Sequence, residues 1–133
     1  MVLIEFKCIQ IDFLDIPPAE PPAGRTKSVR VLKAQTLENM SDIKAILQLK
    51  FAPYDTCHPA GDTIEKWIPT QIPQLTNYWN GSTFKELRNK YKAVAYFVLI
   101  IGSRKILVSQ LSNDGESLGE YHLVGELDPP DFT

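Results

Sequence analysis

The N-terminal segment alternates between apolar and polar residues, as a strand with two different faces does. One side of an extended chain here carries Val2, Ile4, Phe6 and Cys8. From Ile9 the apolar positions continue in the opposite phase, through Ile11 and Phe13. A period of two that slips by one residue predicts a strand over residues 2–13 with a bulge or sharp bend near Cys8.

A proline-rich segment separates this strand from a second one. Four prolines fall within residues 17–22, and proline cannot donate a ladder or helix hydrogen bond. We expect an extended surface connector, and the alternative is a docking motif for an aromatic-lined groove, using Pro18 and Pro21. Beyond it, two valines alternate with basic and polar residues, which predicts a half-exposed strand over residues 26–34.

The middle of the chain changes to the three- and four-residue spacing of amphipathic helices. This spacing predicts a helix of about three turns over residues 40–51. A second helical stripe runs over residues 62–80, where Pro69 and Pro73 interrupt it. Because proline fits a first helical turn and breaks a helix interior, the stripe predicts two short helices with a break near the prolines. Another short helix is predicted over residues 83–90.

The last third of the chain returns to strand patterns. Residues 93–101 form a continuous apolar run, which is typical of a central strand covered on both faces. A second strand is predicted over residues 106–111 and a third over residues 118–127. The sequence Asn113-Asp114-Gly115 between them is a strong hairpin signal.

The order of the elements indicates the α+β class, because strands gather at both ends of the chain and helices lie between them. We expect an antiparallel sheet of about five strands, made of an N-terminal strand pair and a C-terminal three-strand meander. Two to four short helices from the middle of the chain are expected to pack on one face. No linker divides the chain, so residues 1–133 are predicted to form a single domain.

Composition and charge narrow the classes of function. The 133 residues are 44% hydrophobic and 23% charged, which is ordinary globular usage. There are 14 basic and 16 acidic residues, so the charge balance gives no support to nucleic-acid binding. The longest apolar run, residues 93–101, is far short of a membrane span. Two cysteines and no visible signal peptide indicate a reducing compartment, and we expect a cytoplasmic protein.

One polar loop gathers residues that bind metals or act as nucleophiles. It runs from Asp55 to Asp62 and includes Cys57 and His58. Together with His122 these residues are the candidate metal ligands, and Cys57 is a candidate nucleophile. The spacing matches no strong zinc motif, since neither Cys-x-x-Cys nor His-Glu-x-x-His is present. The alternative is that both aspartates are turn and cap residues that accept hydrogen bonds from backbone amides.

Large aromatic rings are concentrated in and just after the helical stripe. One interpretation is a core layer between the helices and the sheet. The other is an exposed patch for a protein partner, because Trp and Tyr dominate interface hot spots. With the two prolines of the connector, the candidate interaction surface consists of Trp67, Tyr78, Trp79, Pro18 and Pro21.

These observations favour a small non-catalytic cytoplasmic protein that acts through protein–protein interaction, as a regulator, inhibitor or adaptor. A protein partner or self-association is expected, with a homodimer as one form of it. The sequence identifies no catalytic residue and no cofactor. The alternative is a small metal- or thiol-dependent hydrolase that uses the Asp55–Asp62 loop.

Overall fold

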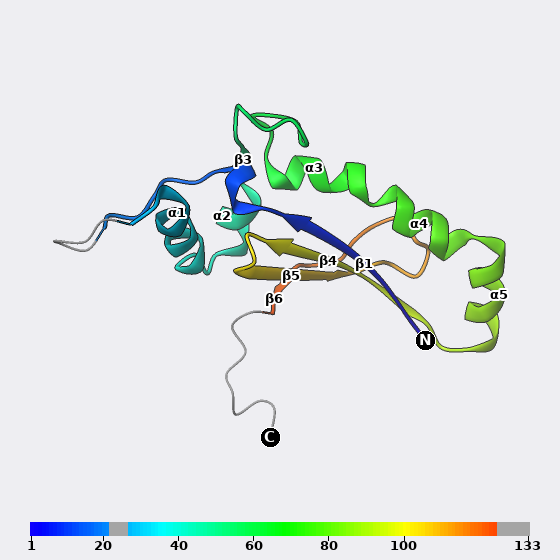
Figure 1. The fold of residues 1–133 in the computed structure, drawn as a ribbon. Coiled ribbons are helices and arrows are strands. Elements are labelled where there is room, and N and C mark those ends of the chain that lie inside the picture. The colour runs from blue at the N-terminus through cyan, green and yellow to red at the C-terminus, as the bar shows by residue number, and fades with distance from the viewer. Residues whose placement is uncertain (22–26, 125–133) are drawn as a thin grey trace, which may run out of the picture.

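The computed structural model describes residues 1–21 and 27–124 of the chain (Figure 1). Within these residues no helix is long and apolar enough to cross a membrane. The elements, in chain order, are β1 (Val2–Ile9), the 3₁₀ turn η1 (Ile11–Phe13), β2 (Leu14–Asp15), α1 (Val29–Glu38), α2 (Ile43–Leu47), β3 (Lys50–Phe51), α3 (Ile64–Gln71), α4 (Pro73–Asn80), α5 (Ser82–Lys90), β4 (Val94–Ile101), β5 (Lys105–Gln110) and β6 (His122–Leu123).

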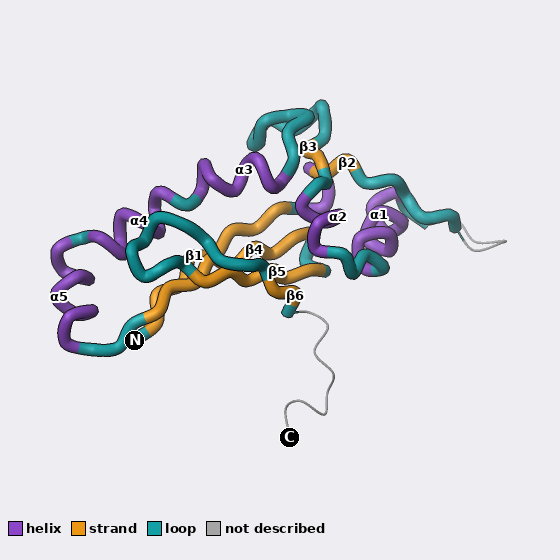
Figure 2. Tube along the Cα trace, turned by 180° about the vertical axis from the view of Figure 1, so that it is seen from behind, coloured by secondary structure: helices purple, strands orange, loops and turns teal. Residues whose placement is uncertain are grey.

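The main sheet has four strands in the order β1-β4-β5-β6 (Figure 2). β1 runs parallel to β4, whereas β4, β5 and β6 are antiparallel neighbours. β2 and β3 form a separate antiparallel pair. The α+β class and a mostly antiparallel sheet are therefore confirmed. The predicted five-stranded antiparallel sheet is wrong, because the main sheet is mixed and its N-terminal strand pairs with the distant β4.

The predicted second strand over residues 26–34 is also wrong. Residue 26 lies outside the described residues, and the segment from residue 29 onward is the start of α1. The Ser28 hydroxyl accepts a hydrogen bond from the Val31 amide at 3.3 Å and so caps the first helical turn. Ala34 and Leu37, three positions apart, are buried on one side of the helix. The alternation of two valines is too short to outweigh a capped amphipathic helix.

The predicted helix over residues 40–51 is limited to the five residues of α2. The Asp42 carboxylate accepts a hydrogen bond from the Lys44 amide at 3.0 Å and starts the helix there. Phe51 then pairs with Leu14 between β3 and β2, and this pairing requires an extended backbone. Tertiary pairing therefore ends the helix before the apolar spacing does.

α3 and α4 follow one another along one side of the main sheet (Figure 1). α3 ends at Gln71 and α4 begins at Pro73, so the predicted break between two short helices is confirmed. α4 contacts both β1 and β4. α1 and α2 lie near the end of the sheet that carries the β4–β5 turn. Side chains that fill the core between the sheet and the helices include Leu75, Trp79, Phe97 and Leu99.

The C-terminal meander keeps its predicted order, but its last strand is short. β6 consists of His122 and Leu123, and an isolated bridge joins Leu111 to Leu118 around the predicted turn. Residues 125–127 of the predicted strand lie outside the described residues. β4 is central in the sheet, as expected from its continuous apolar run. The helices, however, cover only one of its two faces.

Candidate interaction surface

The side of the main sheet that turns away from α3 and α4 is named here the open face. Residues in register on neighbouring strands point to the same side of a sheet, and side chains alternate along each strand. The rows that cross the open face are Ile4, Tyr96 and Gln110; then Phe6, Val98, Val108 and His122; then Cys8, Ile100 and Ile106. The intervening residues of β4, such as Phe97 and Leu99, are buried beneath the helices.

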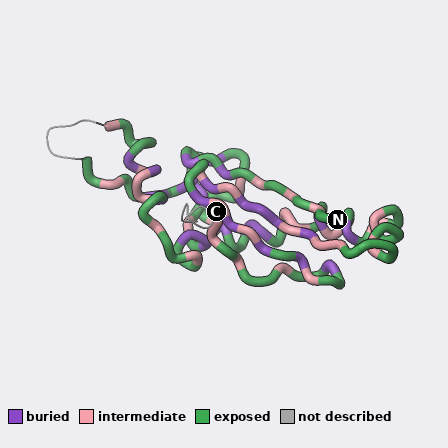
Figure 3. Tube along the Cα trace, turned by 90° about the horizontal axis from the view of Figure 1, so that it is seen from below, coloured by how far each residue is buried: buried purple, intermediate pink, exposed green. Residues whose placement is uncertain are grey.

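The open face is mostly apolar, with Gln110 and His122 as its polar side chains on the strands. In the strands of the described chain, none of its side chains belongs to Asp, Glu, Lys or Arg. Val2 is 57% exposed and Ile4 is 44% exposed, both on the edge strand β1. Figure 3 shows the molecule from this side, with the strands running across its middle, α5 at one end and α1 at the other. The largest contiguous apolar patch of a protein is often an interaction site.

β1 turns its charged residues inward and its apolar residues outward. The side chains of Glu5 and Lys7 lie on the helix side and form an ion pair of 3.2 Å. Lys7 also donates a hydrogen bond to Gln74 of α4 at 3.5 Å. Phe6, between the two charges, points to the open face and is 58% exposed. A strand whose outer side faced only water would show the opposite arrangement, with polar residues outward.

A groove of about 490 Å³ lies at the far side of the open face from β1. It is lined by Tyr96, Val108, Gln110, Gly119, Glu120 and His122. The open face therefore carries a protruding ring on β1 and a hollow over β5.

The residues of the predicted interaction surface lie in different places. Trp67 and Trp79 are buried, with exposures of 7% and 2%, whereas Tyr78 is 59% exposed. Tyr78 lines a hollow of about 460 Å³ between α4 and α5. Pro18 and Pro21 are exposed on the connector beside α1, at the other end of the molecule (Figure 1). The five residues do not form one continuous surface.

Trp79 holds the loop between β5 and β6 against the helices. Its indole Nε1–H donates a hydrogen bond to the Asn113 carbonyl oxygen at 3.0 Å. The Phe84 ring packs against it at a centroid distance of 5.4 Å, and the Arg88 guanidinium lies 4.5 Å from the ring centroid. Gly115 of the same loop is buried against the indole. These contacts account for the burial of Trp79 within the chain itself.

The Asp55–Asp62 loop is organised around the buried Asp55 carboxylate. One of its oxygens accepts hydrogen bonds from the backbone amides of Cys57 at 2.7 Å and His58 at 3.1 Å. The other lies 2.8 Å from Nδ1 of His58. The His58 ring stacks on Phe51 at a centroid distance of 4.4 Å and meets the edge of Trp67 at 5.2 Å. Asp55 is thus a turn residue, as the structural alternative predicts.

The other candidate metal ligands do not gather around this pair. Cys57 is exposed, Asp62 pairs with Lys66 at 3.4 Å, and His122 belongs to the open face. Thr63, rather than Asp62, caps α3. Among the described residues no group of three or more His, Cys, Asp or Glu side chains is placed to hold a metal ion. The geometry of the loop is that of a packed aromatic and imidazole cluster.

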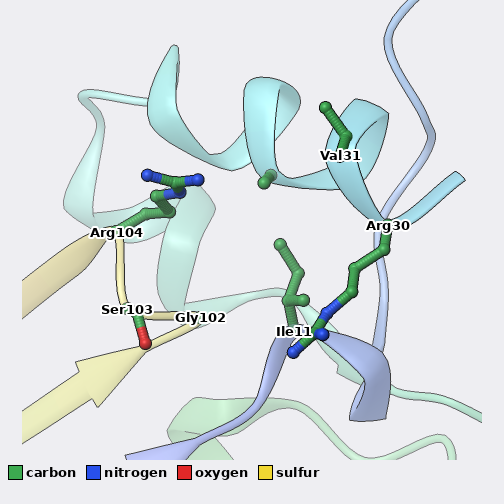
Figure 4. Close-up of a pocket in the computed structure, with 7 residues that line it drawn as sticks. Ile11, Arg30, Val31, Gly102, Ser103 and Arg104 are labelled. Atoms are coloured by element: carbon green, nitrogen blue, oxygen red, sulfur yellow. The ribbon is translucent and has the colours of Figure 1, made fainter. Parts of the chain in front are cut away.

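A third hollow, of about 360 Å³, lies between α1 and the β4–β5 turn (Figure 4). Arg30 and Arg104 approach it from opposite sides, with Ile11 between them. The Arg30 guanidinium lies 3.3 Å from the Asp12 carboxylate, and both side chains are largely exposed. The opening is a seam where α1 meets the end of the sheet.

Two groups in the C-terminal part of the chain, Tyr121 and Asp114, have shifted pKa values. Burial, and secondarily the negative charge of Glu65 on α3, raises the pKa of the Tyr121 hydroxyl. A hydrogen bond from the Ser112 hydroxyl, followed by one from the Glu116 amide, lowers the pKa of the Asp114 carboxyl. Tyr121 packs against the buried core. The next residue, His122, points to the open face by alternation.

Comparisons of this chain with protein-family models, with curated proteins and with solved structures give no match. The function must therefore be argued from the chemistry of the surface itself.

The sequence did not single out the open face, although two signals for it were present. Phe6 stood in the alternating pattern of β1, and residues 93–101 predicted a strand covered on both faces. The alternation shows that the strand has two unlike faces, but it does not say which of them is covered. Only the three-dimensional arrangement of α3 and α4 shows that they cover the opposite side of β1.

Proposed function

We propose that this chain is a non-catalytic protein that acts through protein–protein interaction, with the open face as its binding surface. The observation that carries the proposal is the inverted pattern of β1. Glu5 and Lys7 pair with each other on the side that α4 covers, and the large apolar side chains of β1 are exposed on the other side. A partner that covered this side would also give β4 the second covered face that its continuous apolar run predicts.

A partner is expected to bind the open face because its exposed apolar side chains gain free energy when they leave water. Each fully buried apolar side chain gains about 1.5–3 kcal/mol relative to exposure, and about half of that remains to be gained at Phe6. Several such positions in one uncharged patch supply a driving force for association without desolvating any charge. An inhibitor, adaptor or regulatory subunit would use such a face. Two free cysteines, Cys8 and Cys57, fit the reducing conditions of the cytoplasm, where we propose that the protein acts.

Site-specific photo-crosslinking in the host cell tests the proposal. A photoreactive phenylalanine analogue replaces Phe6 in one variant and Tyr78 in a matched control. The two positions are 58% and 59% exposed, but they lie on opposite sides of the sheet. We expect crosslinks to protein, including a second copy of this chain, from position 6 at a clearly higher yield than from position 78. Equal yields, or crosslinks only from position 78, would refute the open face as the binding surface.

The alternative, a metal- or thiol-dependent hydrolase, has one supporting observation in the Asp55–His58 pair at 2.8 Å. Within the described residues the Cys57 thiol makes no hydrogen bond, so no base is placed to activate it. Metal analysis of the purified protein distinguishes the two functions. A stoichiometric metal that is lost in Cys57→Ser would favour the hydrolase over the binding protein.

A further inference from the structure

We propose that the partner of the open face is a second copy of this chain, in a symmetric dimer whose two main sheets pack face to face. This inference rests on the proposed function, since it assigns the occupant of the same surface.

The open face is complementary to itself in shape. It carries a projecting ring, Phe6, on β1 and a groove of about 490 Å³ whose lining includes Val108 and Gln110 on β5. One copy can therefore insert its ring into the hollow of the other. A symmetric contact makes this insertion twice, because in an isologous interface each patch meets its own copy.

The register of the sheet defines where the symmetry axis must lie. Phe6 is in register with Val98 of β4, and Val98 is in register with Val108 of β5. The ring and the groove thus lie on either side of the central strand, in one row. A two-fold axis parallel to β4 and above it places β1 of each copy over β5 of the other. Each Phe6 then faces the groove beside Val108 of the second copy.

The absence of charge favours a second copy over a different partner. A charged patch would repel itself in a symmetric contact, because like charges would meet across the axis. The strands of the described chain place no such charge on the open face. Outside the strands, Glu120 contributes one carboxylate to the lining of the groove. Across the strands themselves, self-association therefore brings no like charges together.

The size of the face sets the strength of the dimer. β1 and β4 have eight residues each, so the face is roughly 26 Å long and, across three strands, about 14 Å wide. The flat area of two such faces is about 730 Å², so even with the corrugation added by the side chains the dimer lies at the small end of specific interfaces, which begin at about 1,200 Å². Two such sheets pack about 10 Å apart, as the layers of a sandwich do. We expect a dimer that dissociates in the micromolar range.

Sedimentation equilibrium of the full chain between about 1 µM and about 1 mM tests the dimer. We expect the mass to rise from 15.0 kDa toward twice that value with concentration. Phe6→Asp should weaken association by at least about 100-fold, because a buried aromatic anchor is lost at two symmetric contacts. Tyr78→Asp, at a position of the same exposure on α4, should leave the dissociation constant unchanged. A wild-type protein that stays monomeric at every concentration overturns the inference.

A mixing experiment tests the arrangement of the two copies. The experiment mixes Phe6→Asp with Gln110→Lys, which places a cation in the groove. Both positions are exposed, so both variants should keep the fold, and circular dichroism and urea unfolding check this. Each variant alone should be largely monomeric. Mixed in equal amounts, they should recover dimers, because Asp at position 6 of one copy meets Lys at position 110 of the other. Failure to recover dimers would overturn the face-to-face arrangement.

The dimer and the proposed function fail in distinguishable ways. If sedimentation finds only monomers while position 6 crosslinks to a different protein in the cell, the second copy is wrong and the binding face stands. If position 6 crosslinks to no protein, including this chain, the proposed function is wrong as well.

Discussion

Substituting Gly115 by alanine tests whether the loop between β5 and β6 packs directly against the Trp79 indole. Gly115 has a φ of +76°, in the left-handed region that favours glycine. A Cβ added there would lie 2.7 Å from Cδ1 of Trp79 and 3.0 Å from Nδ2 of Asn80. Asn80 can swing its side chain away, but Trp79 is held by its hydrogen bond to Asn113 and by Arg88. The contact therefore cannot be relieved cheaply.

Gly61 provides the matched control for this substitution. Its φ is +80°, almost the same, but a Cβ added there meets no atom within 4 Å. Gly61→Ala should cost about 1 kcal/mol, since the left-handed conformation is unfavourable while the unfolded chain loses some freedom. Gly115→Ala carries the same cost and adds about 1–3 kcal/mol of overpacking against the indole. Its total is about 2–4 kcal/mol, a large part of the stability of a domain this size.

Urea unfolding followed by circular dichroism measures both variants. The free energies of unfolding are extrapolated to zero denaturant, and unchanged m-values confirm that the two transitions are comparable. We expect Gly115→Ala to be the less stable of the two by at least about 1 kcal/mol. Equal destabilisation within about 0.5 kcal/mol would refute the contact with Trp79 and the docking of the loop.

Three further predictions concern other parts of the chain. Trp79→Phe removes the hydrogen bond to Asn113 and should cost about 1–2 kcal/mol in urea unfolding, with faster hydrogen exchange of the loop amides; unchanged exchange would contradict it. Asp55→Ala removes the acceptor of three part-buried hydrogen bonds in its loop and should cost about 1–3 kcal/mol, and a loss below about 0.5 kcal/mol would show that the carboxylate does not organise the loop. Tyr121 has a raised pKa in the folded chain, so its contribution to stability is present below pH of about 10 and is lost as the pH rises through the folded pKa. The thermal midpoint of the wild type should therefore fall more steeply than that of Tyr121→Phe above that pH, and parallel curves would contradict the assignment.

The sequence determined those features that depend on neighbouring residues. Pro73 divided the helical stripe into two helices, because proline is favoured in a first turn and α4 begins there, whereas Pro69 is accommodated inside α3. The continuous apolar run of residues 93–101 identified the central strand. Asp55 was recognisable as a turn residue, since its carboxylate bonds amides two and three positions ahead.

Tertiary structure decided everything that depends on which distant segments meet. The pairing of β1 with β4 joins residues more than ninety positions apart, and no local pattern specifies it. That pairing made the sheet mixed, and the placement of α4 over Glu5 and Lys7 decided which side of β1 is covered. The period of two showed that β1 has two unlike faces, but a strand by itself cannot determine which one the helices will choose. Because the helices cover the side of Glu5 and Lys7, Phe6 is exposed on the other side, and the function proposed for the open face depends on this exposure.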